Sequence, residues 1–200
     1  MGKKSNPWVS IADLFSSVTL VVLLLFVMGL VAPRMFVEQQ RKEIMNQYTS
    51  DFADFESKGQ IRIYADKSLV EFTSVTFQQG SALLSNDAKT LARALAVKLR
   101  QSMDENPRLE VLIEGHTDPA VVRATTYRGG YFENNIQLSS LRAINVREEL
   151  IKTMGQEYSP RIGVAGYGET RLKNTEDVFS PDNRRVELRF FWDGRSAEAK

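Results

Sequence analysis

An apolar run from Ile11 to Ala32 constrains this chain more than any other feature. Only Asp13 within the run can carry a charge. A helix of this length spans about 33 Å, which is close to the hydrocarbon thickness of a bilayer. Trp8 precedes the run, at a place where tryptophan meets the membrane interface, and Pro33 follows it. The sequence therefore predicts one transmembrane helix over residues 11–32, ended by Pro33.

A cleaved signal peptide is the alternative interpretation, because Lys3 and Lys4 provide a basic start. The apolar stretch is long for a signal peptide, carries an acid at its head and is followed by no small-x-small cleavage motif. An uncleaved anchor is therefore favoured. Basic residues lie on both sides of the run, so charge alone orients it weakly.

Asp13 is the most informative residue of the run. A charged side chain at the centre of a bilayer costs about 2.5–3.5 kcal/mol even on lenient scales, and it persists where it faces protein or a water-filled path. Such a carboxyl group can carry a proton or hold a cation. The alternative is a helix N-cap at the interface, with Ser10 as the competing cap. The nearby hydroxyls either support an ion path or let helices pack closely; they belong to Ser16, Ser17 and Thr19.

Composition excludes several classes of protein. The net charge is +1, and no basic stripe indicates a nucleic-acid partner. The chain has no cysteine, which rules out disulfides and thiolate metal sites. His116 is the only histidine, and no nucleophile motif, phosphate loop or metal-ligand spacing is present. We therefore expect neither an enzyme nor a bound metal or cofactor.

The segment after the apolar run, residues 33–59, is predicted to be a helical linker. An apolar stripe recurs in it at helical spacing: Ile44, Tyr48, Phe52 and Phe55. This stripe indicates a helix that packs on its own domain or forms a short dimeric coiled coil. A plug that blocks ion flow is the less favoured alternative.

Residues 60–194 alternate between strand and helix patterns and predict an α/β domain, with helices on one side of a mixed sheet in βαβαβ order. Residues 1–10 and 195–200 are short termini. The expected strands are Ile61–Tyr64, Leu69–Val75, Leu109–Glu114, Ile162–Ala165 and Arg185–Trp192, and the expected helices are Asn86–Met103 and Leu138–Met154.

Five motifs in this domain together resemble the OmpA-like family. In chain order they are GSALLS (80–85), IEGHTD (113–118), NIQLSSLRAINV (135–146), GYGET (166–170) and NRRVEL (183–188). The resemblance implies an OmpA-like sandwich that binds the peptide stem of peptidoglycan. It also implies that Asp118 and Arg142 hold the amine and the carboxylate of diaminopimelate.

The chemistry of these two residues suits a zwitterionic ligand. Arginine offers a bidentate fork for a carboxylate, and a helix start adds partial positive charge. The alternative is a structural ion pair between Asp118 and Arg142. Residues 119–134 form an unusually long connection beside this pocket, which could add contacts, cover it or serve a dimer. The remaining residues expected to line or brace the pocket are Thr117, Asn135, Leu138, Asn183 and Arg185.

The start of the chain resembles another family. The sequence WVSIADL, residues 8–14, is similar to the start of the stator B subunits MotB, PomB and ZorB, and is closest to ZorB of the Zorya anti-phage systems. The resemblance implies that Asp13 binds the transported ion, H⁺ or Na⁺. It further implies an inner-membrane protein with a cytoplasmic N-terminus and a periplasmic domain, two copies of which sit inside five copies of a MotA-like or ZorA-like partner.

Three alternatives remain at this point. The chain could serve a flagellar motor of the MotB type, or it could be a plain tether between the inner membrane and peptidoglycan. An ExbD/TolR-type energy transducer also carries a membrane aspartate. Its periplasmic domain is smaller and lacks the HTD and LSxxRA motifs that this chain has.

Overall fold

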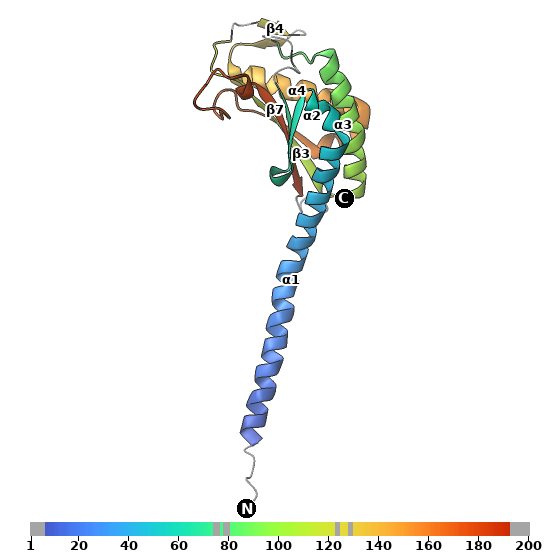
Figure 1. Ribbon diagram of the computed structural model, residues 1–200, viewed down its shortest axis with the longest axis vertical. Coiled ribbons are helices and arrows are strands. Elements are labelled where there is room, and N and C mark those ends of the chain that lie inside the picture. The colour runs from blue at the N-terminus through green and yellow to red at the C-terminus, as the bar shows by residue number, and fades with distance from the viewer. Residues whose placement is uncertain (1–6, 74–76, 78–80, 123–124, 128–129, 193–200) are drawn as a thin grey trace, which may run out of the picture. The chain divides into compact units, whose positions relative to one another are not determined.

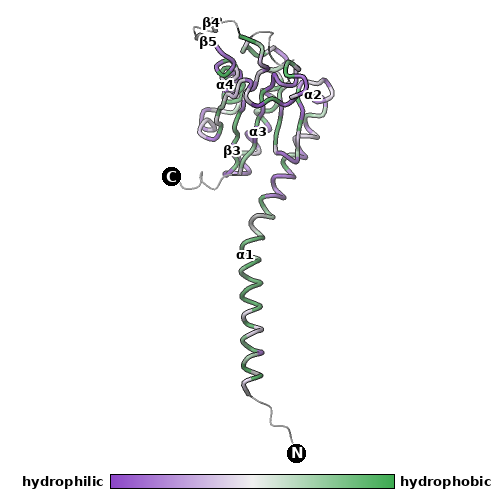
Figure 2. Tube along the Cα trace, turned by 90° about the vertical axis from the view of Figure 1, so that its left-hand side faces the viewer, coloured by the Kyte–Doolittle hydropathy of each residue, from purple (hydrophilic) through white to green (hydrophobic). Residues whose placement is uncertain are grey.

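The computed structural model describes residues 7–73, 77, 81–122, 125–127 and 130–192. The chain divides into two compact units, residues 1–41 and 42–200. The first contains most of helix α1 (Pro7–Asp51), whose large apolar side chains are exposed from Trp8 to Val37. Figure 2 shows this hydrophobic stretch along α1. By length and composition, the helix can cross a membrane.

Helix α1 differs from the prediction at both ends. It begins at Pro7, so Asp13 lies in its second turn and is not an N-cap. The expectation that Pro33 ends the helix is wrong, because α1 continues to Asp51. A proline costs a helix one backbone hydrogen bond, and the residues on either side of it can still keep theirs.

The second unit contains a five-stranded sheet in the order β1-β2-β7-β3-β6. Only β3 and β6 pair in parallel, so the sheet is mixed and the predicted α/β class is confirmed. Strands β4 and β5 pair antiparallel in a separate two-stranded sheet. The elements are α2 (Ala53–Ser57), β1 (Ile61–Tyr64), β2 (Leu69–Phe72), α3 (Asn86–Glu105), β3 (Leu109–His116), β4 (Thr125–Tyr127), β5 (Gly130–Phe132), α4 (Asn135–Met154), β6 (Ile162–Gly166), β7 (Arg185–Trp192) and the short 3-10 helices η1 (Ala65–Lys67), η3 (Gln156–Arg161) and η4 (Pro181–Asn183).

Side-chain caps set the starts of the two long helices of the domain. The Ser85 side chain accepts a hydrogen bond from the backbone N–H of Ala88, and the Asn134 side chain accepts one from Gln137. Because Asn134 caps the helix, α4 begins three residues before the predicted Leu138. Strand β2 ends at Phe72, before the predicted end at Val75. Val75 itself lies outside the described residues, as do Gly80 of the first motif and residues 123–124 and 128–129 of the long connection.

One face of the sheet is apolar and supports the core. Helices α3 and α4 pack against each other, and α4 packs on β3 and β6 (Figure 1). The sheet residues buried in this core alternate along each strand, as the pleat requires. They are Ile61, Val70, Phe72, Leu109, Val111, Ile113, Ile162, Val186, Leu188 and Phe190.

The end of α1 is part of the same core. Ile44, Met45, Tyr48 and Phe52 are buried in it, so the stripe packs on its own domain. The ring of Tyr48 meets that of Phe190 edge to face at 5.2 Å, and its hydroxyl lies 3.3 Å from the Ser102 hydroxyl. Residues predicted to link two parts of the chain thus stabilise the folded domain.

We expect Tyr48→Ala to lower the free energy of unfolding of the domain by about 3–5 kcal/mol, because it leaves a cavity in a fully packed core. Tyr48→Phe loses only one long hydrogen bond and should cost about 1 kcal/mol. Urea unfolding of the full-length chain in detergent, followed by near-UV circular dichroism, measures both. Asn46→Ala, at an exposed position of the same turn, is the control. A Tyr48→Ala protein as stable as the control would show that this turn lies outside the core.

Candidate functional site

Two glycines let helix α4 approach the sheet closely. A Cβ at Gly115 would overlap the backbone carbonyl of Ser139, and one at Gly166 would overlap the backbone and side chain of Ser140. The Ser139 hydroxyl then accepts a hydrogen bond of 2.9 Å from the backbone N–H of Gly168. This contact brings the first turns of α4 beside the ends of β3 and β6.

Asp118 lies two residues after β3 and is 8% exposed. Its carboxylate forms an ion pair of 2.6 Å with Arg184, and its other oxygen accepts a hydrogen bond of 3.3 Å from the backbone N–H of Ala120. Asn135, in the first turn of α4, donates its side-chain N–H to the backbone carbonyls of Asp118 and Ala120. Asn135 therefore fixes the backbone that presents the acid.

Arg142 is 6% exposed, yet it makes no ion pair with a described residue. Its Nε donates a hydrogen bond of 3.2 Å to the backbone carbonyl of Ser81, and its guanidinium lies over the Phe77 ring at 5.2 Å. Burial lowers the pKa of Arg142 to about 10, despite the opposing charge of Asp118. The guanidinium is thus charged at neutral pH and only partly compensated. The geometry does not support a structural ion pair between Asp118 and Arg142.

Thr117 and Leu138 complete this end of the domain. The backbone N–H of Thr117 donates to the carbonyl of Gly168 at 2.9 Å, and the Thr117 hydroxyl is buried without a hydrogen-bond partner among the described residues. Leu138 packs with Ala82 and with Phe132 of β5 in a small second core. The long connection predicted over residues 119–134 is therefore anchored beside the pocket by Phe132.

Asn183 and Arg185 lie elsewhere than expected. Asn183 is fully buried, and its amide group bonds to backbone groups between Lys173 and Val178, which closes that loop. Arg185 bonds through Nε to Glu187 at 2.7 Å on the other face of the sheet. Sequence reasoning missed Arg184, the neighbour that contacts Asp118. Alternation along the motif NRRVEL could have indicated that the two arginines serve opposite faces.

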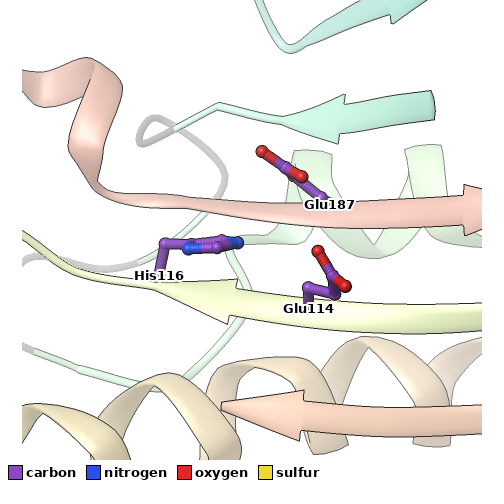
Figure 3. Close-up of side chains that lie close together, drawn as sticks. All are labelled: Glu114, His116 and Glu187. Atoms are coloured by element: carbon purple, nitrogen blue, oxygen red, sulfur yellow. The ribbon is translucent and has the colours of Figure 1, made fainter. Parts of the chain in front are cut away.

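Buried charges fill the second face of the sheet. Glu114 and His116 of β3 and Glu187 of β7 point toward one another, with ligand-type atoms within 4.8 Å (Figure 3). Arg189 bonds both carboxylates, at 3.1 Å to Glu114 and 2.8 Å to Glu187, and Arg185 bonds the other oxygen of Glu187. These guanidinium groups oppose a further cation, so the cluster suits an ion-pair network better than a metal site.

His116 is held neutral inside this network. Burial, reinforced by the charge of Arg185, lowers the pKa of His116 to about 4, and the Tyr167 ring stacks on the imidazole at 5.5 Å. For Glu187, burial by itself would raise the pKa, but the hydrogen bond and charge of Arg185 outweigh it and lower the pKa. The surroundings therefore favour a neutral His116 and an ionised Glu187.

The polar residues of the apolar run sit together on α1. The hydroxyls of Ser16, Ser17 and Thr19 donate to the carbonyls four residues earlier, at 2.8–2.9 Å. Ser17 thus bonds the backbone of Asp13, while the Asp13 side chain is exposed on the single chain. The structure brings these four residues into two successive turns of one helix.

The fold and these side chains define an α/β domain that presents a buried acid and a buried arginine near one end of a mixed sheet. A sequence profile of the OmpA family matches residues 76–185, which is more than half of the chain. The chain therefore belongs to the OmpA family. No curated protein matches it significantly.

Solved structures share this fold. A MotB-like protein from Desulfovibrio vulgaris is 25% identical, with a TM-score of 0.61 over 80% of this chain and 98% of that one. The cell wall anchor of the T6SS from Pseudomonas aeruginosa is 23% identical, with a TM-score of 0.54 over 72% and 96%. The periplasmic domain of Helicobacter pylori MotB is 20% identical, with a TM-score of 0.52 over 68% and 90%.

We expect the free energy of unfolding to fall as the pH is lowered from 6.5 to about 4. In this window the unfolded chain takes up a proton at His116, whereas the folded domain does not. One such proton contributes a slope of at most about 1.4 kcal/mol per pH unit. Urea unfolding at pH steps from about 7.5 to 4.5 should show a shallower slope for His116→Asn than for the wild type. Equal slopes would show that His116 is protonated in the folded state.

Proposed function

We propose that this chain is the B subunit of an ion-driven rotary stator. The proposal depends on one observation: a single chain joins an OmpA-family domain to an apolar run of membrane length, residues 11–32, whose only acid is Asp13. A tether needs no charge in lipid, and a charge placed there is costly. The similarity to the MotB-like protein from Desulfovibrio vulgaris supports the proposal.

In this proposal the domain grips peptidoglycan. The guanidinium of Arg142, which makes no ion pair with a described residue, binds a carboxylate of the peptide stem, and Asp118 binds its amine. A buried cation without an ion-pair partner is costly, and a bound carboxylate removes that cost. The domain lies in the periplasm, and the N-terminus of the chain lies in the cytoplasm.

The helix carries the ion. Two copies of α1 lie inside a ring of five copies of a MotA-like or ZorA-like partner, and Asp13 of each copy loads H⁺ or Na⁺ from the periplasmic side. One elementary charge crossing 100 mV yields about 2.3 kcal/mol. Neutralising and recharging Asp13 changes its contacts with the ring, and the ring turns around two helices that the wall holds still. Ser16, Ser17 and Thr19 support the ion path.

The resemblance of residues 8–14 to ZorB leads us to propose a Zorya-type anti-phage role, with a flagellar motor as the alternative output. The partner that co-purifies with the chain separates them: a long cytoplasmic tail on a MotA-like partner supports the Zorya role, and a short one supports the flagellar role. Purification without any ring-forming partner would instead support a plain tether to the cell wall. The cell wall anchor of the T6SS from Pseudomonas aeruginosa shares this fold.

We expect Arg142→Ala to weaken binding of the full-length chain to purified peptidoglycan sacculi by about ten- to a hundredfold, since hydrogen bonds to charged groups contribute about 1.5–3 kcal/mol. Arg142→Lys keeps the charge but loses the bidentate geometry of the guanidinium, so its affinity should lie between those of the wild type and Arg142→Ala. Co-sedimentation measures the binding. Lys152→Ala, at an exposed position of the same helix, should bind like the wild type. Undiminished binding by Arg142→Ala would remove this residue from the site.

We expect Asp13→Asn to assemble with the partner and to conduct no ions, because the amide keeps the shape of the side chain but cannot be charged. Ion flux into proteoliposomes that contain the purified complex measures conduction. The matched control is Glu38→Gln, the same chemical change outside the apolar run, and it should conduct normally. Normal conduction by the Asp13→Asn complex would contradict the stator proposal while leaving wall binding intact.

A further inference from the structure

The pocket holds more positive than negative charge among its described residues. Arg142 and Arg184 contribute two guanidinium groups, and Asp118 contributes one carboxylate. The charges are shared unequally, since Arg184 pairs with Asp118 at 2.6 Å while Arg142 pairs with no described acid. Arg142 can therefore accept a carboxylate directly, whereas an amine would have to compete with Arg184 for Asp118.

We propose that Arg184 occupies the place of the ligand's ammonium group in the unliganded pocket, and so determines how strongly the pocket discriminates for an amine. This inference rests on the proposed binding of a peptide stem. A ligand ammonium must exchange with Arg184 for the Asp118 Oδ2 atom. The ligand carboxylate, by contrast, meets the guanidinium of Arg142, which forms no ion pair with a described residue and so has no acid to exchange.

The exposure and hydrogen bonds of Arg184 and Asp118 indicate which of the two side chains can leave the ion pair more easily. The Arg184 side chain is 36% exposed, and its other hydrogen bond goes to the backbone carbonyl of Phe179 at 3.1 Å. The Asp118 side chain is 12% exposed, and Asn135 bonds the backbone carbonyls of Asp118 and Ala120, which fixes the loop that carries the acid. Arg184 can therefore swing into water at small cost, whereas Asp118 stays in place.

The neighbouring arginine shows that this freedom is specific to Arg184. The Arg185 side chain is 7% exposed and is held by Glu187 at 2.7 Å within the buried network. Breaking that pair would leave a buried charge uncompensated. Breaking the Asp118–Arg184 pair instead returns an arginine to solvent and gives the acid a new cation. The exchange thus conserves the number of ion pairs in the pocket.

The test compares two soluble muropeptides, one that ends in diaminopimelate and the same peptide acetylated on the side-chain amine. Calorimetry with the full-length chain in detergent gives the affinity for each peptide. The quantity compared is the ratio of the affinity for the unmodified peptide to the affinity for the acetylated one. Arg184→Gln should raise this ratio by about two- to fivefold, which corresponds to the contribution of a partly exposed ion pair. Arg184→Lys keeps the competing charge, so its ratio should stay near that of the wild type.

Arg93→Gln is the matched control, because Arg93 forms an exposed ion pair of 2.7 Å with Glu149 on another surface. It should leave the ratio unchanged, and thermal unfolding verifies that each variant is folded. A ratio that stays the same or falls in Arg184→Gln would overturn the inference, even where the wild type binds the unmodified peptide. Failure of the wild type to bind that peptide would instead overturn the proposed peptidoglycan binding.

Discussion

The close packing of α4 on strands β3 and β6 is the contact on which the pocket depends. Gly115 and Gly166 allow it, because any side chain at either position would collide with the helix backbone or with Ser140. Through this contact, residues from three separate segments converge: Asp118 after β3, Asn135 and Arg142 on α4, and Arg184 before β7. A helix displaced outward by one side chain would separate the acid from the arginine and remove the pocket without unfolding the sheet.

The two faces of the sheet are stabilised in different ways. One face buries apolar side chains under α3, α4 and the last turns of α1. The other face buries Glu71, Glu114 and Glu187, each of which is paired with a cation. Only some residues of the motifs shared with the OmpA family therefore lie at the candidate site. In IEGHTD and NRRVEL, His116, Arg185 and Glu187 hold the second face together, while Asp118 and Arg184 face the pocket.

The membrane helix and the domain place opposite demands on a carboxylate. Asp118 is paired and held rigid, which suits a grip that must not slip. Asp13 stands exposed on a lone apolar helix, and in lipid it requires a protein partner to supply its surroundings. In the proposed stator, Asp118 helps to anchor the molecule to the cell wall and Asp13 carries the transported ion. Each half of the chain therefore depends on the other.

The sequence by itself determined the strands of the five-stranded sheet and the two long helices of the domain, because periodicity, turn residues and apolar runs are local properties. The structure also places Asn135 beside Asp118, as the motifs suggested. The sequence did not predict contacts between segments that are distant in the chain. The stripe at Ile44, Tyr48 and Phe52 left open what it packs against, and only the tertiary structure shows it inside the domain core. Likewise, the choice between Arg184 and Arg185 as the partner of Asp118 is made by the pleat of β7 and by the buried acid on its far side. An ion pair depends on distances between segments that folding brings together, and no local pattern encodes those distances.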